Sequence, residues 1–302
     1  MVNKKCIWVN FQSENVNSEP LIDFCKEYDI NKKVITYAMD SSEQARLDIY
    51  SKESTLVLVF KVLNQKKTTD TTNETIPITF ILRGDYVITI TNKDNHYVYE
   101  QMKDCLDKCA KKEILSTTSF LFITLFELID DYFPRIESIN KTLKEMDSVS
   151  QKDNQSNLET LSDLQKRTIY LYSAAVQNNL VLEKMKELPL YNKLPEDEKE
   201  DFNASLAESS QLVSIIDLSN QISQNMSDTY NNYFNNNLNN VMKILTVWSL
   251  ILTIPAIVTG FFGMNIKLPT ESGGKSIGWT FTLILIVSLS FLMSVLIKKI
   301  LK

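Results

Sequence analysis

Two apolar segments without a charged residue lie near the end of the chain, at residues 244–262 and 279–297. Each has about the 20 residues that an α-helix needs to cross the hydrocarbon core of a bilayer. A core helix of a soluble protein is the alternative for one such segment, but two in succession argue against it. We therefore predict a C-terminal transmembrane hairpin of two helices joined by residues 263–278.

Basic residues flank this hairpin at both of its outer ends. Lys243 precedes the first segment, and Lys298, Lys299 and Lys302 follow the second. Positively charged flanks favour the cytoplasmic side of a membrane. We expect a two-span protein of the cell membrane, with a basic tail and both termini in the cytoplasm.

The first 112 residues alternate short β-like runs with helical patterns, which indicates an α/β domain. A helix is predicted over residues 19–28, where Ser18 can cap it, and another over residues 97–112. Gly84 predicts a tight turn between two strands. The predicted strands cover residues 6–10, 33–37, 46–50, 56–62, 76–82 and 86–91.

Long helices are predicted from residue 113 onward, because no glycine occurs between Gly84 and Gly260 and good helix formers dominate. One covers residues 113–150, with Pro134 as a candidate kink, and a second covers residues 158–187. A third, the stalk helix, starts at about residue 195 and continues into the first apolar segment. The predicted domains are residues 1–112, 113–243 and 244–302.

An apolar stripe with steps of three and four residues runs along the stalk helix. The sequence leaves two explanations open, packing within one chain or a coiled-coil-like seam between copies. An unbroken helix would be about 100 Å long at about 1.5 Å per residue, which favours partners. The stripe consists of Leu212, Ile215, Ile222, Met226, Tyr230 and Tyr233.

Composition excludes several classes of function. The formal charge of −5 gives no sign of nucleic-acid binding. The four cysteines form no metal-ligand pattern with the single histidine, His96, and indicate free thiols in a reducing compartment. The sequence has no phosphate-binding glycine loop and no nucleophile motif. We expect a protein without enzyme activity and without a bound cofactor.

Small and polar residues form a second stripe along the first apolar segment. Such a stripe permits close helix packing or lines a polar path, and periodicity does not separate the two. Two helices of one chain cannot enclose a path, so a conducting protein of this design must form oligomers. The stripe includes Asn239, Met242, Thr246, Ser249, Thr253, Ala256 and Gly260.

Phe262-Gly263-Met264-Asn265 follows directly after the first apolar segment. Placed before a short loop, a second apolar helix and a basic tail, this motif resembles the Tyr/Phe-Gly-Met-Asn signature of the CorA magnesium transporter family. Phe262 stands where tyrosine is usual. Lys267 stands where some members have an acidic residue, which puts a strong anionic attraction at the outer mouth in doubt. Asn265 also suits a helix C-cap.

The resemblance implies a homopentameric funnel that conducts Mg2+ through the bilayer into the cytoplasm, with Co2+ and Ni2+ as further candidate cargoes. Gly263, Met264 and Asn265 would form the selectivity filter, in which Asn265 amides hold the ion through its hydration shell. Mg2+ releases its water reluctantly, so neutral amide oxygens can bind the shell without removing it. The implied pore-lining residues are Asn239, Met242, Leu245, Thr253, Ala256 and Gly260.

Cytoplasmic Mg2+ is also the regulatory ion that the resemblance implies. Residues 196–201 and Glu208 could hold such ions between subunits, but a solvated helix start explains this acidic stretch more simply, and the regulatory ligands stay unassigned. Two alternative functions remain. A zinc transporter of the same superfamily is disfavoured by Met264, and a membrane-anchored sensor that does not conduct is disfavoured by the polar stripe.

Overall fold

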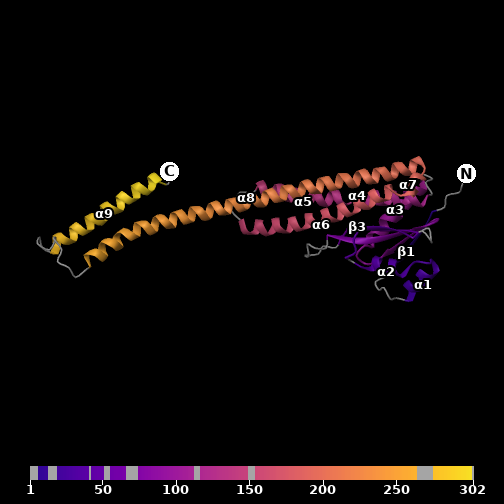
Figure 1. Cartoon of the computed structure of the whole chain (residues 1–302), viewed down its shortest axis with the longest axis horizontal. Coiled ribbons are helices and arrows are strands. Elements are labelled where there is room, and N and C mark those ends of the chain that lie inside the picture. Colours follow the sequence, from indigo (N-terminus) through magenta and orange to yellow (C-terminus); the bar gives the residue numbers. More distant parts are fainter. Residues whose placement is uncertain are drawn as a thin grey trace. The chain divides into compact units, whose positions relative to one another are not determined.

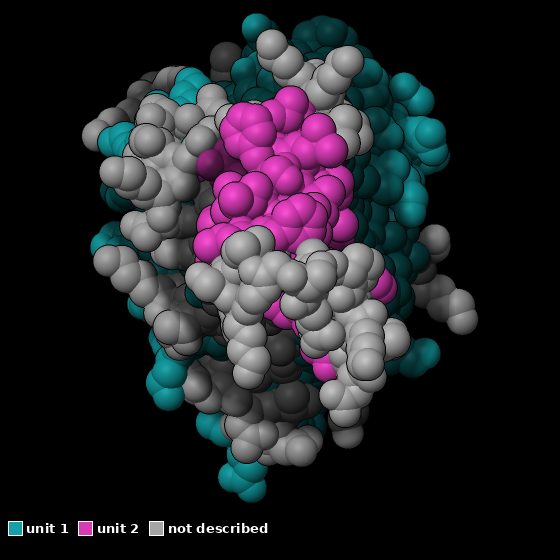
Figure 2. Space-filling view, turned by 90° about the vertical axis from the view of Figure 1, so that its left-hand side faces the viewer, with its two compact units in different colours: residues 1–227 teal, residues 228–302 magenta. Residues whose placement is uncertain are grey.

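The computed structural model describes residues 6–12, 19–40, 42–50, 55–65, 74–111, 116–148, 154–263 and 275–300. The chain forms two compact units, unit 1 with residues 1–227 and unit 2 with residues 228–302, which Figure 2 colours separately. One helix, α8 (Glu196–Phe262), belongs to both units.

A five-stranded sheet with the order β1-β5-β4-β3-β2 forms the centre of unit 1 (Figure 1). β1 pairs with β5 in parallel, and all other neighbours pair antiparallel. Gly84 joins β4 to β5 with a φ of +57°, which glycine adopts without steric cost, so the predicted turn is confirmed. The strands are β1 (Ile7–Gln12), β2 (Arg46–Tyr50), β3 (Thr55–Leu63), β4 (Thr75–Arg83) and β5 (Tyr86–Thr91).

Residues 33–37 were predicted as a strand, and this prediction is wrong because they lie in helix α2 (Lys32–Met39). Asn31 caps this helix, since its side-chain oxygen accepts a hydrogen bond from the Lys33 N–H at 3.0 Å. Val34 and Ala38 are both buried at a helical spacing of four residues. The run of β-branched residues at the centre of α2 produced the strand-like pattern.

Helices cover both faces of the sheet (Figure 1). On one face lie α1 (Glu19–Glu27) and α2, whose Val34 packs in a buried cluster with Val57 and Ile88. On the other face, the Trp8 ring lies 5.2 Å from the Tyr99 ring of α3 (Tyr97–Lys111). The sheet is therefore the middle layer of unit 1, and β3 is buried along its whole length.

The long-helix prediction is confirmed with one correction. The single helix expected over residues 113–150 is two helices, α4 (Thr117–Asp130) and α5 (Tyr132–Ser148), which meet at Asp131. Pro134 does not kink a helix, because it lies in the first turn of α5, where its missing N–H has no helical partner. The remaining helices of unit 1 are α6 (Asn154–Lys186) and the short α7 (Pro189–Asn192), which was not predicted.

The predicted apolar stripe on the stalk helix is only partly buried within the chain. Leu212 is 1% exposed and Ile222 is 44% exposed, and the other stripe residues, Ile215, Met226, Tyr230 and Tyr233, are half-buried. The buried positions of α8 instead follow steps of three and four residues and include several serines. Within unit 1 they are Glu198, Phe202, Ser205, Ser209, Leu212, Ile216, Ser219 and Ser223.

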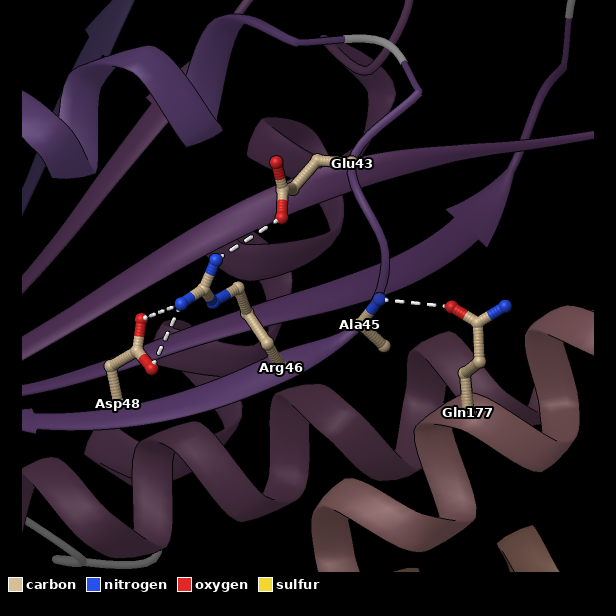
Figure 3. Close-up of polar contacts among 5 residues, drawn as sticks. All are labelled: Glu43, Ala45, Arg46, Asp48 and Gln177. Atoms are coloured by element: carbon tan, nitrogen blue, oxygen red, sulfur yellow. Dashed lines mark hydrogen bonds and ion pairs between the residues drawn. The ribbon is translucent and has the colours of Figure 1, made fainter.

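Polar side chains join α6 to the edge of the sheet where β2 begins. The backbone N–H of Ala45 donates a hydrogen bond to Gln177 Oε1 at 3.0 Å (Figure 3). Beside it, Arg46 forms ion pairs with Glu43 at 3.4 Å and with Asp48 at 2.8 Å. The Ala45–Gln177 bond, between residues 132 positions apart, joins α6 to the sheet, whereas the ion pairs of Arg46 are local.

Candidate functional site

The candidate site lies in unit 2, on the part of α8 that continues beyond residue 227. Within the described residues, one helix is long and apolar enough to cross a membrane, with a mean hydropathy of 2.1 over an 18-residue window of α8. The other helix of the unit, α9 (Lys275–Ile300), contains a shorter apolar stretch, Leu283–Val295. The two-span hairpin stays a prediction.

Every predicted pore-lining residue is exposed in the single chain. Met242 is 64% exposed and Leu245 is 65% exposed, and Asn239, Thr253, Ala256 and Gly260 are exposed as well. Their side chains therefore lie outside the packed core that the described residues form.

The covered residues of the same segment lie on the opposite face of α8. Val258 is 6% exposed, and Val247, Ile251, Ile254 and Pro255 are half-buried. At about 100° per residue, the centre of this covered face lies about 180° from the centre of the predicted pore-lining stripe. The stripe is thus part of a broad exposed surface of the helix, which also includes Trp248 and Leu252 and is free for another molecule or for solvent.

Hydroxyl groups on the exposed stripe donate hydrogen bonds back to their own helix. Thr246 Oγ1 donates to the Met242 carbonyl at 2.8 Å, and Thr253 Oγ1 donates to the Ser249 carbonyl at 2.7 Å. Ser249 forms the same bond to the Leu245 carbonyl at 2.9 Å. Each donor is satisfied inside the helix, and each hydroxyl oxygen keeps a lone pair that can accept a bond from outside.

Gly263 extends the last turn of α8, because its N–H donates to the Thr259 carbonyl at 2.9 Å. A Cβ at position 263 would lie 3.1 Å from that carbonyl oxygen, so the close approach favours glycine. A Cβ at Gly260 would meet nothing within 4 Å, which leaves room for a neighbouring helix. Met264 and Asn265, the other two predicted filter residues, lie outside the described residues.

Two of the five carboxylates in residues 196–201, Glu198 and Asp201, make contacts within unit 1, so the expected solvated helix start holds only for the other three. Glu198 is 4% exposed and accepts a hydrogen bond from Thr118 Oγ1, and Asp201 accepts one from Ser119 Oγ at 3.1 Å. Both hydroxyls belong to the first turn of α4, whose positive dipole end stabilises nearby carboxylates. Sequence reasoning missed this pairing, which joins residues about 80 positions apart.

Glu196 at the surface forms an ion pair with Lys199 at 2.7 Å. The described part of the chain contains no group of three or more His, Cys, Asp or Glu side chains suited to a metal ion. One chain by itself therefore presents no metal centre among these residues.

The cysteines carry no reactive site. All four are free thiols, as predicted, and Cys25, Cys105 and Cys109 are buried. Burial raises the pKa of the Cys25 and Cys105 thiols to about 11, so both stay protonated at neutral pH. A thiol in this state is a poor nucleophile and a poor metal ligand.

Comparison with known proteins gives consistent results. A family model described as "CorA-like Mg2+ transporter protein" matches residues 3–299. The "Cobalt/magnesium transport protein CorA" of Methanocaldococcus jannaschii is 25% identical over 175 residues, which are 57% of this chain and 54% of that protein. The match thus spans about half the length of this curated relative.

Two solved structures have a similar fold. The complete structure of the CorA magnesium transporter from Methanocaldococcus jannaschii has a TM-score of 0.75 at 19% identity, over 98% of this chain and 90% of that one. The full-length CmaX protein has a TM-score of 0.69 at 13% identity, over 99% of this chain and 90% of that one. At these identities the likeness concerns the fold, an N-terminal α/β domain followed by long helices.

Proposed function

The chain belongs to the family of CorA-like Mg2+ transporter proteins, and on this basis we propose that it conducts divalent cations across a membrane, with Mg2+ as its main cargo. Co2+ is a further candidate, because the curated relative carries cobalt in its name. Ni2+ is another, because its charge and size are similar. The family is a transporter family, and we propose no enzyme activity for this chain.

We propose that several copies, five by family resemblance, enclose the path with the exposed face of α8. The observation that carries this proposal is the position of the predicted stripe, which is exposed and opposite the covered side of the helix. Its hydroxyl oxygens can accept hydrogen bonds from the water shell of a passing ion. The exposed Leu218 and Ile222, further toward the start of α8, would add apolar contacts between copies.

Selection would take place at the ring of Asn265 amides at the end of α8. Amide oxygens are neutral, so they can hydrogen-bond the hydrated ion and still release it. Gly263 would support this ring, because its N–H donates to the Thr259 carbonyl and a side chain at this position would crowd that oxygen. Glycine at both 260 and 263 also lets neighbouring helices come close.

We propose regulation by cytoplasmic Mg2+ through carboxylates that are not already engaged in unit 1. Asp197 and Glu200 are exposed and Glu208 is half-buried, whereas Glu198 is buried against α4. Ions held by such exposed carboxylates would need oxygens from a second copy of the chain, because Mg2+ prefers several oxygen ligands.

Flux measured in liposomes tests this function. Purified protein, reconstituted with a Mg2+-sensitive dye inside, should admit Mg2+ faster than protein-free liposomes, and Zn2+ in a parallel assay should enter more slowly. Faster Zn2+ entry would favour the zinc alternative. No entry of either ion, with a correctly folded oligomer, would favour the non-conducting sensor.

A further inference from the structure

Gln101 of α3 and Asp131 form a hydrogen-bonded pair at the point where α4 ends and α5 begins. Gln101 Nε2 donates to Asp131 Oδ2 at 2.7 Å, and both side chains are half-buried. Further along α3, Lys108 Nζ pairs with Glu127 Oε1 of α4 at 2.8 Å. The two contacts show that α3 and α4 lie side by side in opposite directions, with Asp131 held against α3.

Negative charge is concentrated around Asp131. Glu127 and Asp130 of α4 lie within the turn before it, and Lys108 pairs with Glu127 rather than with Asp131. Burial raises the pKa of Asp131 above its ordinary value of 3.8, and Asp130 and Glu127 raise it further, against the hydrogen bond from Gln101, which lowers it. The ionised form of Asp131 is therefore the less favoured form in this environment.

The other titratable groups that face Asp131 bring it no positive charge. Tyr97 of α3 and Tyr132 of α5 both donate to backbone carbonyls of β3, at 2.8 Å. Arg135, one turn further along α5, forms its ion pair with Glu74 at 3.6 Å. Within the described residues, Asp131 thus has an amide as its partner and no cation.

The second polar atom of the Gln101 amide suits a protonated Asp131. This atom, Oε1, is buried and has no hydrogen-bond partner in the described part of the chain. The opposite orientation of the amide would bring two acceptor oxygens together, so Nε2 faces the ionised carboxylate. An ionised Asp131 has no proton for Oε1, whereas a protonated Asp131 has one.

We propose that Gln101 and Asp131 form a proton-sensitive clasp between α3 and the junction of α4 and α5. With Asp131 ionised, the clasp contains one hydrogen bond, from Gln101 Nε2 to the carboxylate. When Asp131 takes up a proton from solvent, its carbonyl oxygen still accepts from Nε2, and its new hydroxyl donates to Gln101 Oε1. The clasp then contains two hydrogen bonds, so it tightens as the pH falls.

The clasp lies between contacts that fix the neighbouring helices. Ser119 of α4 donates to Asp201 of α8 at 3.1 Å, and Tyr132 of α5 binds the sheet. Because the folded state binds the proton of Asp131 more tightly than the unfolded state does, this proton contributes stability that is complete below pH 3.8 and is lost as the pH rises through the raised pKa. Mild acid should therefore strengthen the attachment of α4 and α5 to α3.

Thermal unfolding of the full chain in detergent, at pH 7 and at pH 4.5, tests the clasp. Asp131→Asn keeps the shape of the side chain and gives Gln101 a permanent donor and acceptor. Its midpoint should exceed that of the parent protein by about 2–4 °C at pH 7, and the difference should shrink at pH 4.5. Asp130→Asn is the matched control, because it removes an exposed carboxylate next in sequence, and it should shift the midpoint by less than about 1 °C at both pH values.

Gln101→Glu tests the clasp with the opposite sign. Two carboxylates would then face each other, so this variant should unfold at least about 2 °C below the parent protein at pH 7 and recover most of this loss at pH 4.5, where the pair can share a proton. A midpoint of Asp131→Asn below that of the parent protein at pH 7 would overturn the proposal, because ionised Asp131 would then stabilise the junction. Differences that are equal at both pH values, in either variant, would overturn it as well.

Discussion

The side-chain amide of Asn178 forms both backbone hydrogen bonds of Lys61, accepting from its N–H at 2.8 Å and donating to its carbonyl at 2.8 Å. Tyr132 of α5 donates to the same carbonyl at 2.8 Å. β2 pairs with β3 only as far as Val59, so Asn178 takes the place of the missing strand at Lys61. Asn178 is 1% exposed, and this contact fixes α6 to the sheet away from water.

Replacing Asn178 should therefore weaken unit 1. Asn178→Ala leaves two buried backbone groups of Lys61 without this partner, and we expect a loss of about 2–4 kcal/mol in the free energy of unfolding. Chemical denaturation of the full chain in detergent, followed by circular dichroism, measures the change. Asn179→Ala is the control, because its bonds to Glu183 and Ser210 lie at the surface, and it should cost less than about 0.5 kcal/mol. Equal losses in both variants would contradict the assignment.

The side chain of Lys61, in contrast to that of Asn178, should lower the stability of unit 1. It is 8% exposed, and burial lowers its pKa more than the nearby carboxylates of Glu43 and Asp40 raise it. The folded state therefore binds this proton less tightly than the unfolded state, so the ammonium costs stability at neutral pH and this cost disappears as the pH rises toward the ordinary value of 10.5.

We expect Lys61→Met to unfold at a higher midpoint than the parent protein at pH 7. At pH 10 this difference between the two midpoints should be smaller. Thermal unfolding at both pH values measures this. A lower midpoint for Lys61→Met at pH 7 would mean that the ammonium is well solvated or paired in the native protein.

The elements of this fold were largely predictable, because strands and helices follow from local periodicity. Short β-like runs predicted β2 and β5 with their observed bounds, and the absence of glycine predicted a long helix that continues into the first apolar segment, as α8 does. The strand predicted over residues 33–37 failed because β-branched side chains suit a strand locally, while packing of Val34 and Ala38 on the sheet favours a helix.

Contacts between distant residues were not predictable from one sequence. Nothing near Asn178 indicates that it pairs with Lys61, 117 residues away, and nothing near Glu198 indicates Thr118. The candidate site shows the same limit. Helical spacing defined the stripe on α8, but it could not indicate which face the chain itself covers.

Glu198 tests the distinction between structural and regulatory carboxylates. Glu198→Ala removes the acceptor of Thr118 Oγ1 in a buried contact and should cost about 1–3 kcal/mol of unfolding free energy. The exposed Glu200→Ala, as control, should cost less than about 0.5 kcal/mol. If regulatory Mg2+ binds to exposed carboxylates, millimolar Mg2+ should protect the parent protein from proteolysis. This protection should persist in Glu198→Ala. Loss of that protection at unchanged stability would make Glu198 a regulatory ligand.

Met242 and Leu245 are the candidates for a gate. Both are apolar and more than 60% exposed in the single chain, so neither belongs to its core. Around a narrow pore such side chains would block a hydrated ion by excluding water. Leu245→Asp should hydrate the constriction and weaken closure by Mg2+. Conductance should therefore persist at saturating cytoplasmic Mg2+.

A packing role for Leu245 predicts a different result, because a charge buried between helices costs several kcal/mol and should dissociate the oligomer. Oligomer size, measured together with conductance, separates the two roles. Val258→Asp offers a comparison on the covered face of α8, where only the structural effect is expected.

Mg2+ uptake by liposomes that contain Asn265→Ala tests the central claim, an oligomeric channel that selects hydrated Mg2+ at a ring of asparagine amides. Because the amide is the proposed ligand of the hydration shell, the variant should form oligomers of the size of the parent protein and lose Mg2+ uptake at least about 10-fold, which corresponds to about 1.4 kcal/mol. Uptake by Asn265→Ala at the rate of the parent protein would contradict the claim.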